Sequence, residues 1–287
     1  MNRSHGWEPA LRNAIARYGS ANTDTRHLWR KVLSRLWAIP LEHHNQQVLR
    51  WSDGVVLCSM DDPDLITDRY GTCTEKLLAL APGIDPWYLE PLSQPCNHPD
   101  CWSWILGFGN FCPPKAPEVV ASVFRGVATT VKGFEGTWVC PKMFHKDVCA
   151  LLGDAAGLVK CKDWMSKKDL RTLFDRHGLF LFPCYFEGLA LTFLQAMARR
   201  LCVLGTRGDA MRQTLRDGIN GFRFERGDAE GITARALRWQ ENPEELKSIS
   251  RNARMSAEEY TWLQSAHRYS DFCSTLLERR KKLYCKC

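Results

Sequence analysis

The stretch Leu179–Ala198, with the sequence LFLFPCYFEGLALTFLQAMA, guides the interpretation of the whole chain. Its first four residues are apolar and lie between Gly178 and Pro183, a pattern typical of a short buried strand in a parallel sheet. A turn with Glu187 and Gly188 follows, and apolar residues then recur at helical spacing. In open α/β sheets such a turn lies at the carboxyl edge, where free N–H groups at the start of the helix bind phosphates. The stretch therefore predicts an α/β fold with an anion-binding crevice beside Glu187.

The composition sets the size and class of the protein. The chain has 287 residues, of which 45% are hydrophobic and 25% charged, enough for one large or two ordinary domains with buried cores. No apolar run is long enough to span a membrane and the N-terminus lacks the apolar segment of a signal peptide, so we expect a cytoplasmic protein with mostly reduced cysteines. The net charge of +7 suits an anionic nucleotide-sugar, an acidic membrane surface or nucleic acid, and charge alone does not choose among them.

Three short motifs carry a resemblance to a known family. The segment PCYFEG at 183–188 is followed by QAMA at 195–198 and by DGINGF at 217–222. In this order and spacing they resemble the signature of the family 4 glycosyltransferases (glycosyl transferases group 1), which are retaining enzymes of GT-B fold. The family pattern has Ser where this chain has Cys184, and Glu where it has Gln195. The resemblance implies an α/β protein with a Rossmann-like domain that binds a nucleotide-sugar.

The same resemblance implies two Rossmann-like halves that face each other across a cleft. The first half is incomplete here, so we expect an N-terminally truncated member of the family. The expected parts are a partial acceptor-side domain at 1–90, a linker or insertion at 91–118, a complete nucleotide-sugar-binding domain at 119–259, and a C-terminal helix crossing back to the first part at 260–287. Within the first part we predict helices at 41–52 and 61–70 on either side of a strand that begins near Val55.

A second element of the family is expected near the start of the later domain. The run at 119–124 is predicted as that domain's first strand, and Gly126 is followed six residues later by Lys132 and another glycine. This pattern resembles the family's Gly-Arg-x-Lys-Gly element, whose Arg and Lys face the donor diphosphate. Val127 stands at the Arg position, and Arg125 keeps the same side of an extended chain, so we expect Arg125 to replace it. The alternative is that Lys132 is an ordinary surface lysine.

The resemblance also implies the roles of individual residues. Glu187 and Lys132 are the expected catalytic pair, and the position of Gln195 is expected to hold the ribose hydroxyls. The backbone expected to hold the donor sugar belongs to three consecutive residues, Gly188, Leu189 and Ala190. His5 is expected on the acceptor side, the alternative being an exposed histidine without a role.

The expected reaction is transfer of a hexose from a nucleotide-sugar with retention of configuration. The leaving diphosphate needs positive charge, which Lys132, Arg125 and the N–H groups at the start of the helix can supply. A double displacement would require a second carboxylate close to the sugar carbon, and no residue is placed for it. Relatives are thought to react on one face of the sugar, without a metal ion. We expect no metal and no other cofactor.

Several partners and alternatives follow. We expect a nucleotide-diphosphate sugar as donor, a glycan, lipid or small molecule as acceptor, and no nucleic acid. The helix predicted at 24–39 has Leu and Trp on one side and Arg and Lys on the other, so it fits either an anionic membrane surface or a packed position with a solvated basic face. A half-sheet with open edges favours a partner chain or a homo-oligomer.

Two alternatives to an active transferase stay open. The first is a non-catalytic or partner-dependent subunit of glycosyltransferase type that binds a nucleotide or a protein. The second is a zinc-stabilised interaction module, for which three thiols and one imidazole are the candidate ligands: Cys96, His98, Cys101 and Cys112.

Overall fold

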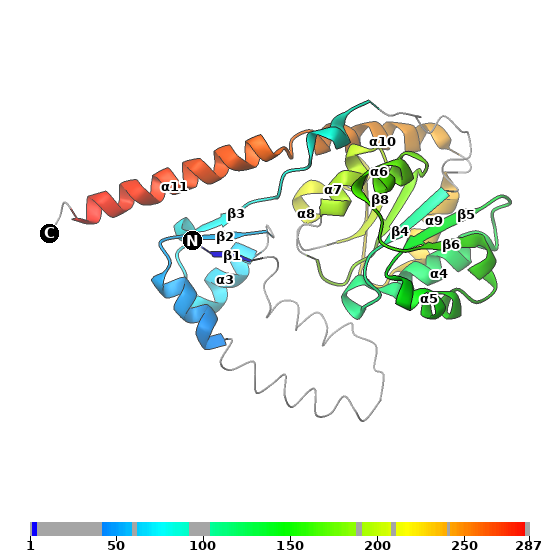
Figure 1. The fold of residues 1–287 in the computed structure, drawn as a ribbon, viewed down its shortest axis with the longest axis horizontal. Coiled ribbons are helices and arrows are strands. Elements are labelled where there is room, and N and C mark those ends of the chain that lie inside the picture. Colours follow the sequence, from blue (N-terminus) through cyan, green and yellow to red (C-terminus); the bar gives the residue numbers. More distant parts are fainter. Residues whose placement is uncertain are drawn as a thin grey trace, which may run out of the picture.

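The computed structural model describes residues 2–4, 42–58, 62–91, 104–187, 191–207, 211–239 and 242–284. These residues form two α/β units joined by a linker and by one long helix (Figure 1). A six-stranded sheet lies in the later unit, the C-terminal domain, and a three-stranded sheet in the earlier one, the N-terminal unit. Every strand pair in both sheets is parallel, so the predicted α/β fold with Rossmann-like units is confirmed.

The sheet of the C-terminal domain has the strand order β6-β5-β4-β7-β8-β9. Its strands are β4 (Trp104–Phe108), β5 (Glu135–Val139), β6 (Val159–Lys162), β7 (Leu179–Phe182), β8 (Cys202–Thr206) and β9 (Gly221–Phe224). The predicted buried strand is confirmed as β7, which lies between β4 and β8. Its leucines pack into one hydrophobic core and its phenylalanines into the other, because side chains alternate between the faces of a strand.

Helices cover both faces of this sheet. The helices of the domain are α4 (Pro117–Ala128), α5 (His145–Leu152), α6 (Lys167–Asp175), α7 (Leu191–Ala198), α8 (Met211–Thr214), α9 (Ala229–Arg238) and α10 (Pro243–Ala257). Helices α4, α5 and α9 pack on the face of the β7 leucines, and α6 and α7 on the face of its phenylalanines. Helix α10 packs along α7 and contributes residues to both cores. A doubly wound domain of this kind buries its central strands completely.

The strand expected at 119–124 is wrong. These residues lie in α4, where Val119, Val120, Val123 and Phe124 are buried at helical spacing. A short run rich in valine does not by itself distinguish a strand from a buried helix, and Pro117 at the start of the helix is the signal that favours the helix. The first strand of the sheet is instead β4, which lies inside the segment expected as a linker or insertion.

The N-terminal unit is smaller. Its parallel sheet has the order β1-β2-β3, formed by Asn2–Ser4, Val55–Leu57 and Leu77–Ala79. A helix at 42–51 and helix α3 (Asp62–Tyr70) pack beside it, which confirms the helices predicted around a strand near Val55. The core contains five buried side chains: Leu49, Val55, Leu57, Ile66 and Leu77.

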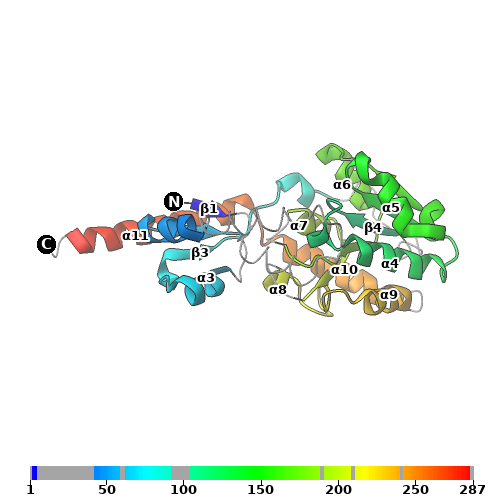
Figure 2. The same cartoon turned by 90° about the horizontal axis from the view of Figure 1, so that it is seen from below.

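The two units are connected by the last helix and by a linker, the segment between β3 and β4. Ile84 pairs with Thr261 as an isolated parallel bridge, and helix α11 (Trp262–Tyr284) then runs from the C-terminal domain along the N-terminal unit (Figures 1 and 2). The Ser265 hydroxyl donates a hydrogen bond of 2.9 Å to the carbonyl of Ala81. Further along α11, Leu276 lies so close to Gly54 that a Cβ on that glycine would come within 2.4 Å of it. Within the described residues, no helix has both the length and the apolar character needed to cross a membrane.

Candidate functional site

The topology of the larger sheet marks one place for a ligand. From β4 the chain adds β5 and β6 in one direction, then returns to the other side of β4 and adds β7, β8 and β9. The strand order therefore reverses between β4 and β7. In open α/β sheets, ligands bind beyond the carboxyl ends of the strands at such a switch point. The loops that follow β4 and β7 are thus the first places to look for functional side chains.

A lysine and a glutamate from these two loops meet at the switch point. Lys115 ends a short 3-10 helix (Pro113–Lys115) after β4, and its Nζ forms an ion pair with Oε2 of Glu187, which follows β7. The backbone N–H of Tyr185 donates a hydrogen bond of 2.9 Å to the carbonyl of Pro114, which fixes one loop against the other. The side chains of Lys115 and Glu187 are 22% and 20% exposed, so the pair is partly shielded and still open to a ligand.

The surroundings of Lys115 favour its charged form. Burial lowers the pKa of its amine. The sulfur of Cys184 and the carboxylate of Glu187 together raise the pKa by a larger amount, so that it lies above the ordinary value. The ammonium also lies 5.3 Å from the centre of the Phe182 ring, where a cation is attracted to the aromatic face. The site therefore offers a permanent positive charge in a partly desolvated place, where charge interactions are stronger than in water.

The thiol of Cys112 lies in the same loop. It is half-buried, and burial raises its pKa, so it stays a neutral thiol. Of the four residues considered as zinc ligands, the other three, Cys96, His98 and Cys101, lie outside the described residues, as does the helix predicted at 24–39.

The structure separates Lys132 from Glu187. Lys132 is exposed in the turn between α4 and β5, at the amino edge of the sheet, whereas Glu187 lies at the carboxyl edge. Arg125 lies within α4, where its guanidinium donates to the carbonyl of Leu151. Gly126 lies in the same helix and packs against Thr233 of α9. Arg125, Gly126 and Lys132 were expected at the donor site because a strand was predicted at 119–124. That segment is a helix, so the three residues do not lie at the carboxyl edge of the sheet.

Sequence reasoning missed Lys115, although a signal for it exists. Gly109 precedes Lys115 by six residues, the same spacing as between Gly126 and Lys132. The residue after Lys115 is Ala116, whose φ of 49° is in the left-handed region that favours glycine, as in the Lys-Gly pair of the expected element. The pattern fits better here because a true strand, β4, ends directly before it.

The remaining expected positions are only partly described. Gln195 lies in α7 and is 9% exposed. Gly188, Leu189 and Ala190, which connect Glu187 to α7, lie outside the described residues, and so does His5. The motif at 217–222 forms a tight turn, in which the Asn220 side chain accepts a hydrogen bond from the N–H of Arg216 and donates one to the carbonyl of Thr214. That motif therefore has a structural role in leading the chain into β9.

An aromatic pair lies further along the same carboxyl edge. Phe108 ends β4, and its ring centre is 5.1 Å from that of Trp164, which follows β6. Trp164 is 47% exposed. Because neighbouring strands are about 4.8 Å apart, the loops after β4 and β6 are separated by about 10 Å. A planar, partly exposed ring of this kind suits contact with a flat heterocycle.

A doubly wound domain with a cation and a carboxylate at its switch point, beside a second parallel α/β unit, is the architecture of proteins with the GT-B fold. Comparison with known proteins agrees. Residues 154–256 match the family described as glycosyl transferases group 1, a segment that includes Glu187 and Gln195. Over this segment the C-terminal domain is therefore similar to the group 1 glycosyl transferases.

Curated relatives cover the chain to different extents. A sucrose synthase from Thermosynechococcus vestitus is 33% identical over 97 residues, which are 32% of this chain and 12% of the relative. A D-inositol 3-phosphate glycosyltransferase from Streptosporangium roseum is 21% identical over 243 residues, which are 79% of this chain and 56% of the relative. The chain thus spans between about an eighth and about half of the length of these relatives.

Solved structures show the same fold at low identity. A glycosyltransferase from Rickettsia africae has a TM-score of 0.70 and 15% identity, with 96% of this chain and 76% of that chain covered. The Anabaena protein Alr3699/HepE, in complex with UDP and glucose, has a TM-score of 0.65 and 15% identity, with 79% and 65% covered.

Proposed function

We propose that this chain transfers a hexose from a nucleotide-diphosphate sugar to an acceptor with retention of configuration, with the donor bound at the switch point between β4 and β7. The observation that carries this proposal is the meeting of Lys115 and Glu187 at the carboxyl edge, on the loops that topology selects. The family match supports the class of reaction, and the UDP and glucose named with one similar structure support the type of donor.

Lys115 serves the leaving diphosphate. As the bond to the sugar breaks, negative charge grows on the diphosphate, and a cation fixed beside it stabilises the transition state more than the bound donor. The raised pKa of Lys115 keeps this cation available at neutral pH. The start of α7 lies at the same edge of the sheet and adds the positive end of a helix dipole.

Glu187 serves the donor sugar. Its carboxylate accepts hydrogen bonds from sugar hydroxyls once the diphosphate has attracted Lys115, and charge-assisted bonds of this kind orient the sugar strongly. Gln195 lies in the middle of α7, and its side-chain amide can both accept a hydrogen bond from ribose hydroxyls and donate one to them. The Phe108 and Trp164 rings, at the same carboxyl edge, are the candidate surface for the base.

Retention is proposed to occur on one face of the sugar, with the leaving phosphate helping to deprotonate the acceptor. No metal ion is proposed for this step. The acceptor is a glycan, a lipid or a small molecule, and it is expected on the side of the N-terminal unit.

Turnover tests this proposal directly. With UDP-, GDP- and ADP-linked hexoses as donors, the full chain is expected to release the nucleoside diphosphate of one of them, and Glu187→Gln is expected to reduce the rate at least about 100-fold, the size seen when one preorganised polar group is removed. Proton NMR of the product gives its anomeric configuration. Release at the same rate by Glu187→Gln, or an inverted product, would contradict the proposed chemistry.

A second candidate is a non-catalytic subunit that binds a nucleotide or a partner chain. Two departures from the family pattern favour it. Gln195 stands where the family has Glu. If the Gly-Arg-x-Lys-Gly element is assigned to the segment from Gly109 to Lys115, Asn110 stands where the family has Arg. Both changes remove a charge from the donor site. Nucleotide binding without any turnover, in the presence of each donor and a panel of acceptors, would select this candidate over the enzyme.

A further inference from the structure

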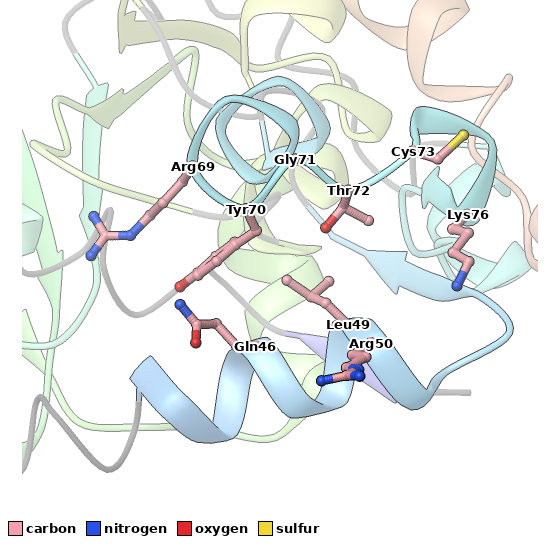
Figure 3. A pocket seen from close by; sticks show the side chains of 9 residues that line it. All are labelled: Gln46, Leu49, Arg50, Arg69, Tyr70, Gly71, Thr72, Cys73 and Lys76. Carbon is pink, nitrogen blue, oxygen red and sulfur yellow. The ribbon is translucent and has the colours of Figure 1, made fainter.

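The N-terminal unit contains a pocket with a volume of about 550 Å³, shown in Figure 3. It is lined by Gln46, Leu49, Arg50, Arg69, Tyr70, Gly71, Thr72, Cys73 and Lys76. The helix at 42–51 leads into β2, and the segment after α3 leads into β3, so these residues lie at the amino edge of the small sheet. The carboxyl end of β3 leads to the linker and the other domain, and the pocket is therefore separate from the donor crevice. Its volume is in the range of small-molecule sites.

The charges around this pocket are unbalanced. Its lining includes three cations and no carboxylate. Arg69 is already paired with Glu42 at 2.8 Å. Within the described part of the chain, no carboxylate pairs with Arg50 or Lys76: the Lys76 ammonium donates only to the carbonyl of Ser52, at 3.4 Å, and Arg50 lies over the ring of Trp51.

Carboxylates do exist nearby, but other side chains use them. Glu75, next to Lys76, is paired with Arg279 of α11 at 3.0 Å. Asp53 is paired with Arg280 of the same helix at 3.3 Å. Helix α11 thus pairs with the neighbouring acids, and among the described residues the two pocket cations have no carboxylate partner.

A purely structural explanation accounts for only part of this arrangement. Arg50 and Arg69 stand in the last turns of their helices, where a cation stabilises the helix by about 0.3–1 kcal/mol. That effect explains a basic residue at each helix end. It does not explain a pocket of this size whose lining adds a hydroxyl and an amide to the cations while excluding every acid.

We propose that this pocket is a second anion site, which binds a phosphate-bearing ligand between Arg50 and Lys76. The arginine offers a planar pair of donors and the lysine a compact charge, and phosphate oxygens accept from both. Thr72 and Gln46 supply further hydrogen-bonding groups. Beside Arg50, the indole of Trp51 is 76% exposed, as expected at the rim of a site for either a soluble phosphate compound or a phospholipid headgroup.

Site-resolved titration of the full chain tests this proposal independently of the donor crevice. Inorganic pyrophosphate is added to nitrogen-15-labelled protein, and the amide signals of Gly71, Thr72 and Lys76 are followed by NMR. Saturable shifts are expected, and the double variant Arg50→Gln/Lys76→Gln is expected to weaken the Kd at these signals about 100-fold, or about 10-fold per lost charged contact. Lys132→Gln is the matched control, because it removes an exposed lysine from the amino edge of the other sheet.

A second arm identifies the source of the phosphate group. The wild type and the double variant are compared in flotation assays with phosphatidylglycerol vesicles, and phosphatidylcholine vesicles serve as the reference. Binding to phosphatidylglycerol that is lost in the double variant assigns the site to a lipid headgroup, and pyrophosphate binding without flotation assigns it to a soluble ligand. Unchanged affinity in the double variant, or no response to either probe, overturns the proposal.

Discussion

The two parallel sheets of this chain differ in how fully they are covered. The sheet of the C-terminal domain is buried between two hydrophobic cores, whereas the sheet of the N-terminal unit has strands of three residues and one small core. Three short strands are close to the minimum for independent stability. The larger domain is therefore expected to fold through its own two cores, whereas the smaller unit relies on the linker and on α11 for part of its packing.

The same contrast exists in their charges. In the C-terminal domain the crevice combines a cation with a carboxylate, as suits a ligand that carries both phosphate and hydroxyl groups. In the N-terminal unit the pocket combines cations without a carboxylate, as suits a simple anion. The first site lies at the carboxyl edge of its sheet and the second at the amino edge, so they are expected to respond to different substitutions.

The largest effect on stability is expected at Arg199. This side chain is fully buried, pairs with Asp175 at 2.6 Å, and donates to the carbonyl of Glu90 in the linker at 2.8 Å. Arg199→Ala removes the cation that balances the buried Asp175 carboxylate, so the free energy of unfolding of the C-terminal domain should fall by about 4 kcal/mol. Urea denaturation measures this loss.

Lys160→Ala is the control for that experiment. Lys160 forms an exposed pair with Glu135, and its removal should cost less than about 0.5 kcal/mol. Equal losses in the two variants would show that the linker is not anchored through a buried charge.

A smaller loss of folding stability is expected in the C-terminal domain when the pH is lowered. Burial lowers the pKa of His177 to about 4, and its ring lies between the carbonyl of Leu173 and the hydroxyl of Thr137. Its folded pKa is below the unfolded value of about 6.5, so stability is complete above that pH and declines as the pH falls toward 4. The decline should reach about 3 kcal/mol.

Denaturation of the wild type and of His177→Gln at pH 7, 5.5 and 4 measures this dependence. The variant should be less sensitive to pH across this range, since it lacks the titrating ring. An identical pH dependence in both proteins would assign the acid sensitivity to other groups.

A still smaller loss of stability is expected from a substitution at the connection between the two units. A Cβ on Gly83 would lie 2.2 Å from the backbone nitrogen of Trp262, and backbone atoms cannot move aside as a flexible side chain can. Gly83→Ala should therefore weaken the pairing of Ile84 with Thr261 by about 2 kcal/mol. Hydrogen exchange should become faster in α11 and in the N-terminal unit, with little change in the larger sheet.

Gly157→Ala is the matched control, because a Cβ at that position meets nothing within 4 Å. If Gly83→Ala instead destabilised the larger sheet as a whole, the independence of the two units would be refuted.

The sequence predicted the central strand well, and it predicted that Glu187 follows this strand in a loop. The run at 179–182 could be assigned because it is short, apolar and closed by Gly178 and Pro183, and Glu187 followed directly. Residues around Val55 were equally clear, since helical and extended patterns alternate there. Local sequence patterns were sufficient to predict these helices and strands, because their identity follows from the residues within each segment.

The basic side of the site could not be found in the same way. Strand β4 lies in a segment rich in Pro, Cys and Trp, which hides its extended pattern, and the valines of α4 favoured a strand that does not exist. Lys132 then repeated the glycine–lysine spacing of Lys115. Only the pairing of strands distinguishes the two lysines, because it decides which of them follows the carboxyl end of a strand.

The pair of lysines provides the most direct test of where the donor binds. Isothermal titration of UDP into the full chain is compared among the wild type, Lys115→Gln and Lys132→Gln, with circular dichroism to verify folding. Loss of the charged contact at the switch point should weaken UDP binding about 10-fold in Lys115→Gln and leave Lys132→Gln equal to the wild type. The reverse order, with Lys132→Gln weakened and Lys115→Gln unchanged, would place the diphosphate at the other edge of the sheet and contradict the account.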